Sequence, residues 1–351
     1  AAATLAMLLK VTPEQAAIWI GLSTLLAGGL QLGWVVLELR DKIRWGRAFH
    51  GVASHARETM RTFLPVLLGL GTLQLNALAD TIIAMWPTWI GPTLLGGPVP
   101  MDEASNAVLG YTQRLYQFPL GVFGIAVATA AFPALARSAS DPARFAGTVV
   151  RGLRLSLFIG LPASIGLLLV RHDLVAVMFS GGGGFSEQGL ERASAVLAGY
   201  AVGVFAYSLN HLLSRAFYAL DDTRTPMRIS LAMVVLNISG NLLLIWPMRE
   251  AGLAWSTAVV AIVQTALLAW MLHRKTGGFE GSILPGMART AVLALVMGLV
   301  TGLVLWFIPE AELWKDHALR LVAAVGAGIM TYASLALVLR APEGRWLIRG
   351  S

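Results

Sequence analysis

The stretch NAVLGYTQRLYQFPLGVFGIAVATAAFPALA, residues 106–136, is long and apolar enough to cross a bilayer as one helix. A transmembrane helix needs about 20 such residues. Arg114 nevertheless lies well inside this stretch. A fixed positive charge at that depth is costly unless the side chain reaches the interface or faces water. The surroundings of this helix therefore decide how the charge is tolerated.

The whole chain has the composition of a polytopic membrane protein. Hydrophobic residues make up 56% of the 351 residues and charged residues 13%, whereas soluble domains carry about 25% charged residues. Cysteine is absent, which excludes disulfides and thiolate metal sites. The net charge of +7 does not indicate a nucleic-acid partner, because the basic residues lie between apolar runs rather than in one domain.

Nine segments are long and apolar enough to span the membrane, which predicts an all-α polytopic transmembrane bundle. They are residues 15–39, 62–86, 105–136, 145–170, 189–216, 226–246, 251–273, 284–308 and 318–340. The opening AAATLAMLL is too short to cross a bilayer. We expect it to be the end of a helix in a sequence whose N-terminal part is missing.

Basic residues are distributed unevenly between alternate loops. The loops of the set that begins at Arg40 hold 19 of the 26 Lys and Arg residues, and the other set holds 6. Basic loops stay in the cytoplasm during insertion. This bias predicts a cytoplasmic C-terminus and an outside N-terminus for this chain.

Asp80 is the acidic residue placed deep inside a predicted span. Asn237 and Asn241 lie four residues apart, hence on one helix face, and Thr257 follows after the next turn. A carboxylate, two amides and a hydroxyl form a hard oxygen set suited to a small cation such as Na⁺. The alternative is hydrogen bonding between helices, which is worth about 1 kcal/mol.

Arg114 allows two interpretations. Its position is roughly 14 Å below the outer start of its helix, at 1.5 Å per residue. The side chain either extends to the interface or faces a water-filled cavity and binds an anion such as phosphate. Tyr111, Gln113 and Gln117 flank it as supporting cavity residues. Pro119 removes an amide donor, so we expect a kink there that widens such a cavity.

No catalytic constellation appears inside the predicted spans, and the histidines show no metal-ligand spacing with carboxylates. The sequence therefore predicts a transporter rather than an enzyme. No cofactor is expected, apart from Na⁺ as a possible coupling ion.

Three stretches resemble the MurJ/MviN family of lipid II flippases. They are YTQRLYQFPLGVFGIAVATAAFPALAR (111–137), LLSRAFYALDDTRTPMRISLAMVVLNISGNLLLIWP (212–247) and AGLAWSTAVVAIVQTALLAWMLHRK (251–275). The resemblance implies a fourteen-helix, two-lobe exporter fold, of which the nine spans are helices 6–14. It divides the chain into a first-lobe remnant (1–40), a basic cytoplasmic connection (41–61), the second six-helix lobe (62–276) and two extra C-terminal helices with a tail (277–351).

The resemblance also implies an activity and a partner. Family members carry the undecaprenyl-diphosphate-linked peptidoglycan precursor, lipid II, across the bacterial inner membrane by alternating access. Arg114 corresponds to a cavity arginine that contacts the diphosphate. Asp80, Asn237, Asn241 and Thr257 correspond to a sodium site, with Asn241 standing where an acidic ligand is expected. The last two spans correspond to a groove for the polyprenyl tail.

Other readings remain open. A different polysaccharide-lipid or multidrug exporter of the same superfamily would share the fold. A non-transporting scaffold would instead bind membrane lipids and recruit cell-wall synthesis proteins. The cavity arginines that the family carries in its first two helices have no counterpart in this sequence, so we expect the fragment alone to be inactive.

Overall fold

The computed structural model describes residues 13–40, 60, 74–94, 96–180, 185–278, 283–309, 311 and 313–349. It comprises two units, residues 1–59 and 60–351. In the first unit, α2 (Pro13–Leu39) is one apolar helix whose segment Gly21–Leu39 is long enough to span a bilayer. Most of the basic connection, the opening AAATLAMLL and residues 62–73 of the second predicted span lie outside the described residues.

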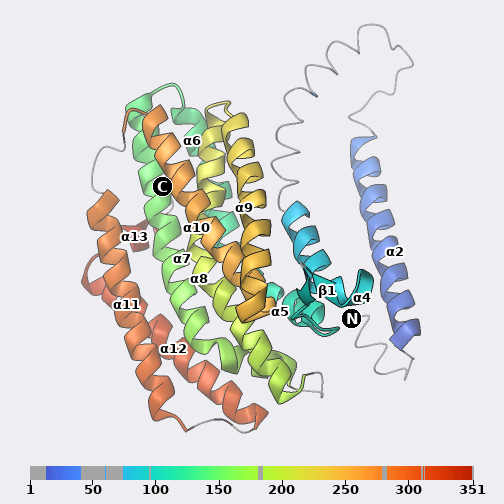
Figure 1. Cartoon of the computed structure of the whole chain (residues 1–351). Coiled ribbons are helices and arrows are strands. Elements are labelled where there is room, and N and C mark those ends of the chain that lie inside the picture. The colour runs from blue at the N-terminus through green and yellow to red at the C-terminus, as the bar shows by residue number, and fades with distance from the viewer. Residues whose placement is uncertain are drawn as a thin grey trace, which may run out of the picture. The chain divides into compact units, whose positions relative to one another are not determined.

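The second unit is a bundle of long helices, and the all-α prediction is confirmed. Its helices run alternately up and down (Figure 1). After a helical stretch at 74–84, they are α4 (Trp86–Trp89), α5 (Ser105–Pro119), the π-helix η1 (Leu120–Ile125), α6 (Ala126–Ser138), α7 (Pro142–Phe179), α8 (Glu187–Ala219), α9 (Arg224–Met248), α10 (Glu250–Lys275), α11 (Ile283–Phe307), α12 (Trp314–Val338) and α13 (Pro342–Arg349). Eight helices in the described part of the chain are apolar enough to span a membrane.

Local sequence signals set the helix boundaries. At the start of α7, the Asp141 side chain accepts hydrogen bonds from the amides of Ala143 and Arg144, and Pro142 occupies the first turn where its missing amide costs nothing. Ser186 caps α8 in the same way through the amide of Gly189. Helix α7 continues to Phe179, nine residues beyond the predicted span end at 170, because helices extend past the hydrocarbon layer into the interface.

Helix α8 lies at the centre of the second unit, where it packs against α5, α6, α7 and α10. Its small residues permit close approach. Two hydrophobic clusters meet along it, one around Tyr200 and one around Phe217. A short antiparallel hairpin that the sequence did not predict, β1 (Thr93–Leu94) with β2 (Gly97–Pro98), closes the loop before α5.

The C-terminal helices use α7 as their main partner. Helices α11 and α12 pack against each other and against α7, and α13 returns to α7. The contacts include the small hydrophobic cluster of Phe158, Leu293 and Ala341, and a hydrogen bond of 2.6 Å from the Tyr332 hydroxyl to the Phe158 carbonyl. Helix α7 thus carries the C-terminal pair on one side and the rest of the bundle on the other.

Candidate functional site

Arg114 lies on the face of α5 that points away from the bundle core. The opposite face buries Val108, Thr112 and Tyr116. Arg114 is exposed within the second unit and has no hydrogen-bond or ion-pair partner among the described residues. The charge therefore sits ten residues into a membrane-length helix without a described counter-ion.

Two of the three predicted supporting residues lie on the exposed face of α5 with Arg114, and the third lies at the side of this face. Tyr111 and Gln117 are three residues before and after Arg114, so they share its exposed face. The Tyr111 ring contacts Phe179 and Phe185, with ring centroids 5.8 and 6.0 Å away. Gln113 is half-buried at the side of this face. The Arg114 face thus combines a cation with an aromatic ring and an amide.

Pro119 marks a change of helix type. It is the last residue of α5, and the π-helix η1 follows it directly before α6 begins. Proline cannot donate to the carbonyl four residues earlier. π-Helical turns are rare in proteins and often occur at functional sites. The sequence signal at Pro119 therefore coincides with an irregular stretch that begins six residues after Arg114.

The four predicted cation ligands lie together in the structure. Asn241 donates a hydrogen bond of 2.6 Å to Asp80 Oδ1 and another of 3.3 Å to Asn237 Oδ1. Asn237 in turn donates to Thr257 Oγ1 at 3.2 Å. Asp80, Asn237 and Asn241 are buried. Residues 161 positions apart in the sequence thus form one polar cluster between the 74–84 helix, α9 and α10.

The chemistry of this cluster fits a small cation. Asn241 Oδ1 is buried and has no hydrogen-bond partner, so it is an acceptor available to an ion. The carboxylate of Asp80 receives one side-chain hydrogen bond, from Asn241. Carboxylate, amide and hydroxyl oxygens are the ligands that hard cations prefer. A single carboxylate matches a monovalent ion better than a divalent one.

Comparison with known proteins adds independent information. The family model described as lipid II flippase MurJ matches residues 2–322. The chain belongs to the MurJ family. A probable lipid II flippase MurJ from Vibrio cholerae is 32% identical over 312 residues, which cover 84% of this chain and 54% of that protein. The Thermotoga maritima relative of the same description is 30% identical, covering 78% and 53%. The chain spans about half the length of the curated MurJ relatives it matches.

Two solved structures share the fold of this chain. The lipid II flippase MurJ in an inward closed conformation matches with a TM-score of 0.69 at 20% identity, covering 92% of this chain and 61% of that one. A MOP superfamily transporter from Pyrococcus furiosus matches with a TM-score of 0.52 at 19% identity, covering 79% and 62%. Both likenesses concern the fold, which is a bundle of helices long and apolar enough to span a membrane.

Two polar networks of this chain were not indicated by the sequence. The first surrounds Asp102, which accepts hydrogen bonds from Arg192 at 2.8 and 2.9 Å and from Arg249 at 2.7 Å. Buried Glu250 accepts from Arg192 at 2.5 Å and from Ser105 at 3.3 Å. The partners in this network are 58 to 147 residues apart in the sequence. No local sequence pattern therefore indicates these contacts.

The second network attaches α13 to α7 and α11. Glu343 in α13 is fully buried and accepts hydrogen bonds from Arg154 at 2.6 and 2.8 Å and from Arg289 at 2.6 Å. The guanidinium groups of Arg151 and Arg154 also lie over the Trp346 ring, 4.7 and 5.3 Å from its centre. A sequence cannot indicate this network because its residues come from three separate helices.

The sequence spacing of the histidines did not indicate that one group of them meets a carboxylate in the fold. His172 and Asp173 of α7 meet His317 of α12, with their ligand atoms within 4.8 Å of one another. Only the neighbouring pair His172–Asp173 was visible in the sequence, and a pair alone is common. The third residue lies 144 positions further along the chain.

Proposed function

We propose that the full-length protein is a lipid II flippase of the bacterial inner membrane. Its substrate is the undecaprenyl-diphosphate-linked peptidoglycan precursor, which it carries from the inner to the outer leaflet by alternating access between two lobes. Membership of the MurJ family supports this proposal. The chain itself corresponds to about half of the curated relatives, so the activity belongs to the longer protein.

The observation that carries the proposal is the state of Arg114. Its guanidinium is exposed, lacks a described partner and lies about 14 Å along a membrane-length helix. Guanidinium groups bind phosphate oxygens through paired hydrogen bonds and keep their charge at any physiological pH. In the proposed function Arg114 holds the diphosphate, with Tyr111 and Gln117 beside it on the same face.

The distribution of charge supports an orientation with the C-terminus in the cytoplasm. Basic side chains concentrate at the end of the bundle where α6 ends and α7 begins, and where α10 ends. They include Arg137, Arg144, Arg215, Arg224, Arg228, Arg274, Lys275, Arg340 and Arg345. Basic residues retained on the cytoplasmic side give that end its proposed location.

The cluster around Asp80 is the proposed site of a coupling cation, with Na⁺ as the candidate. Asp80, Asn237, Asn241 and Thr257 would hold the ion through oxygen atoms. When bound, it would supply the positive charge that balances the buried carboxylate. The unpartnered Asn241 Oδ1 supports this assignment.

The decisive experiment replaces Arg114 in the full-length protein. Arg114→Ala should abolish growth of a strain depleted of its own flippase, because the diphosphate loses its counter-charge at membrane depth. Arg114→Lys should retain part of the activity, since a point charge replaces the paired donors. The matched control is Arg144→Ala, an exposed arginine at the basic end of α7.

Both variants must be present in the membrane at wild-type levels for this comparison. Normal growth of the Arg114→Ala strain would remove Arg114 from the mechanism. Growth defects that follow Arg144→Ala but not Arg114→Ala would instead favour a scaffold that acts through its cytoplasmic surface.

A further inference from the structure

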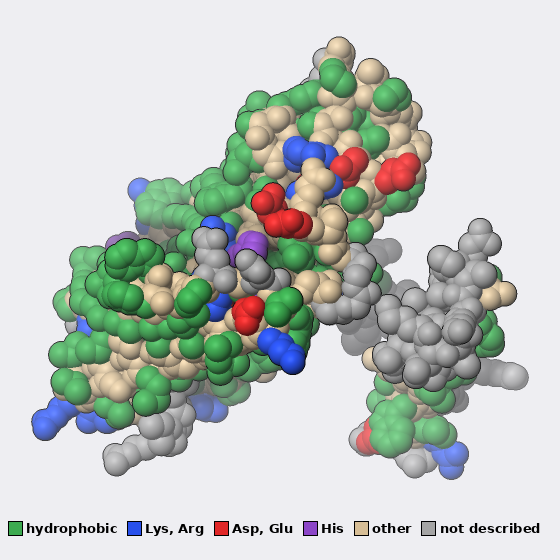
Figure 2. Space-filling model, turned by 90° about the horizontal axis from the view of Figure 1, so that it is seen from below, with side chains coloured by type: hydrophobic (Ala, Val, Ile, Leu, Met, Phe, Trp, Pro, Cys, Tyr) green, Lys and Arg blue, Asp and Glu red, His purple; other side chains and the backbone are tan. Residues whose placement is uncertain are grey.

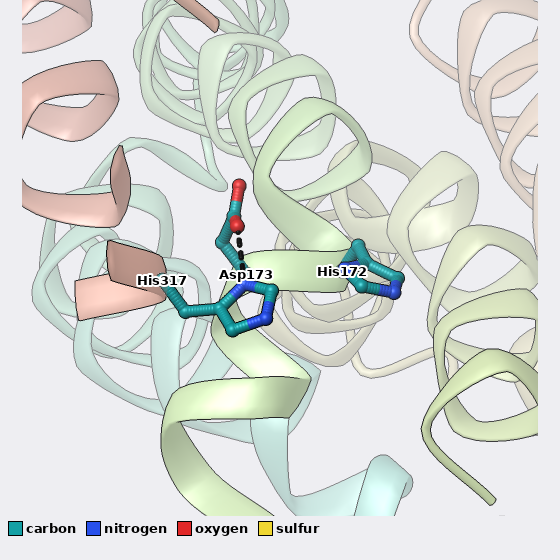
Figure 3. A group of neighbouring side chains, drawn as sticks. All are labelled: His172, Asp173 and His317. Carbon is teal, nitrogen blue, oxygen red and sulfur yellow. Dashed lines mark hydrogen bonds and ion pairs between the residues drawn. The ribbon is translucent and has the colours of Figure 1, made fainter. Parts of the chain in front are cut away.

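Two histidines and an aspartate meet where the end of α7 approaches the start of α12 (Figure 3). His317 Nδ1 lies 2.7 Å from Asp173 Oδ1. The rings of His172 and His317 are 5.5 Å apart between centroids. No other group of three metal-ligating side chains in the described part of the chain comes as close together.

The spacing of these atoms suits a tetrahedral metal ion. Bonds of about 2.0–2.1 Å from zinc to nitrogen or oxygen place the ligand atoms of a tetrahedral site roughly 3.3 Å apart. The separation of 2.7 Å between His317 and Asp173 and the limit of 4.8 Å for the whole group bracket that value. We expect side-chain adjustments to bring the three ligand atoms to this spacing.

The types of ligand favour zinc over Na⁺, Mg²⁺ and Ca²⁺. Two imidazoles and one carboxylate are a common zinc set, which leaves a fourth position for water. Na⁺, Mg²⁺ and Ca²⁺ prefer all-oxygen surroundings and would gain little from imidazole. The Asp173 and His317 side chains are only 7% and 12% exposed, whereas His172 is exposed. The site is thus preorganised on its inner side and open to ions on its outer side.

Neighbouring groups hold the carboxylate in place. Arg320 Nε lies 3.4 Å from Asp173, while its Nη1 donates to the carbonyls of Ile308 and Pro309 at 2.7 and 2.5 Å. Outer contacts of this kind orient metal ligands. The arginine also balances the charge of Asp173 when no metal is bound.

We infer that His172, Asp173 and His317 form a zinc site that joins α7 to α12 at the end of the bundle opposite its basic end. Trp314 adds a hydrogen bond of 2.9 Å to the Val177 carbonyl beside it. Bound zinc would strengthen the attachment of the C-terminal helix pair to the bundle. The inference concerns a different part of the protein from the proposed diphosphate and cation sites.

The test uses the purified full-length protein in detergent, without a histidine tag. Titration with Co²⁺ should produce the visible absorption of a tetrahedral site with one equivalent bound, and Zn²⁺ should displace it. Zn²⁺ should also raise the midpoint of thermal unfolding. His172→Ala should weaken Zn²⁺ binding at least tenfold while leaving the His317–Asp173 contact and the fold intact.

Two further variants make the result unambiguous. Asp173→Asn should weaken binding as well, because it removes the charged ligand. His273→Ala, which changes an exposed histidine of α10, should leave binding unchanged. Wild-type binding by His172→Ala, or an equal loss in His273→Ala, would overturn the inference.

Discussion

At the scale of single residues, this chain places two opposite charges inside its predicted membrane spans, and their surroundings differ. Asp80 is buried and receives a hydrogen bond from Asn241. Arg114 is exposed on α5 without a described partner. A buried carboxylate needs compensation from its own surroundings, whereas an exposed guanidinium is free for a ligand. The two charges therefore suit an internal ion site and a substrate contact, respectively.

The cation assignment predicts a sodium effect that depends on Asp80. Na⁺ should stabilise the full-length protein against thermal unfolding relative to choline at equal ionic strength. A Na⁺ concentration of one hundred times the dissociation constant would raise the free energy of unfolding by about 2.7 kcal/mol. Asp80→Asn preserves the size of the side chain but removes the charge, so this variant should lose the sodium effect. An undiminished response of Asp80→Asn to sodium would contradict the assignment.

At the scale of elements, ion pairs join the ends of helices whose neighbouring apolar residues already pack in one hydrophobic cluster. The cluster of Asp102, Arg192, Arg249 and Glu250 joins the loop before α5, the start of α8 and the turn between α9 and α10. Viewed from this end, acidic and basic side chains lie beside one another among hydrophobic ones (Figure 2). Arg249 adopts a positive φ of 53° at the turn, and its bonds to Pro100 and Asp102 hold it there.

This cluster predicts a loss of stability in acid. Hydrogen bonds from Arg192, supported by Ser105 and Arg249, hold the pKa of Asp102 well below its usual range despite partial burial. A carboxylate whose pKa is lower in the folded than in the unfolded state stabilises the fold at pH values above its unfolded pKa of about 3.9. This stabilisation is lost as the pH falls below that value toward the folded-state pKa. Thermal unfolding of the full-length protein should therefore become easier below about pH 4.

The matched variants isolate the residue responsible. Asp102→Asn should be less stable at neutral pH and should show a shallower decline in acid. Glu103→Gln, which changes the exposed neighbouring carboxylate, should behave like the wild type. An identical acid response of Asp102→Asn and the wild type would exclude Asp102 as the source.

At the scale of the whole molecule, the sequence predicted the helices but not their neighbours. Apolar runs and basic loops predicted the described spans, and the i, i+4 spacing of Asn237 and Asn241 correctly placed both on one face. Their contact with Asp80 was suggested by the oxygen chemistry of these side chains and by the family resemblance. His317 lies 144 positions from Asp173, and Glu343 lies 189 positions from Arg154. The local sequence does not indicate which helices pack together, so these partners could not be assigned.

The Glu343 network predicts how strongly the C-terminal helices are attached. Glu343→Gln would leave Arg154 and Arg289 close together without their shared counter-charge. Breaking a buried ion pair typically costs about 3–5 kcal/mol. The variant should lower the midpoint of thermal unfolding in detergent and expose the end of the chain to proteolysis. Arg345→Ala, an exposed change in the same helix, is the control and should have little effect.

Helix α7 holds the C-terminal pair at two levels. Arg154 and Asp173 are nineteen residues apart in one helix, which is roughly 28 Å at 1.5 Å per residue. That length is close to the hydrocarbon thickness of a bilayer, about 30 Å. Contacts near both ends of this length attach α11 and α12 to α7. These two helices should therefore tilt together with α7. Under the proposed alternating access, a lipid tail lying along these helices would move together with α7.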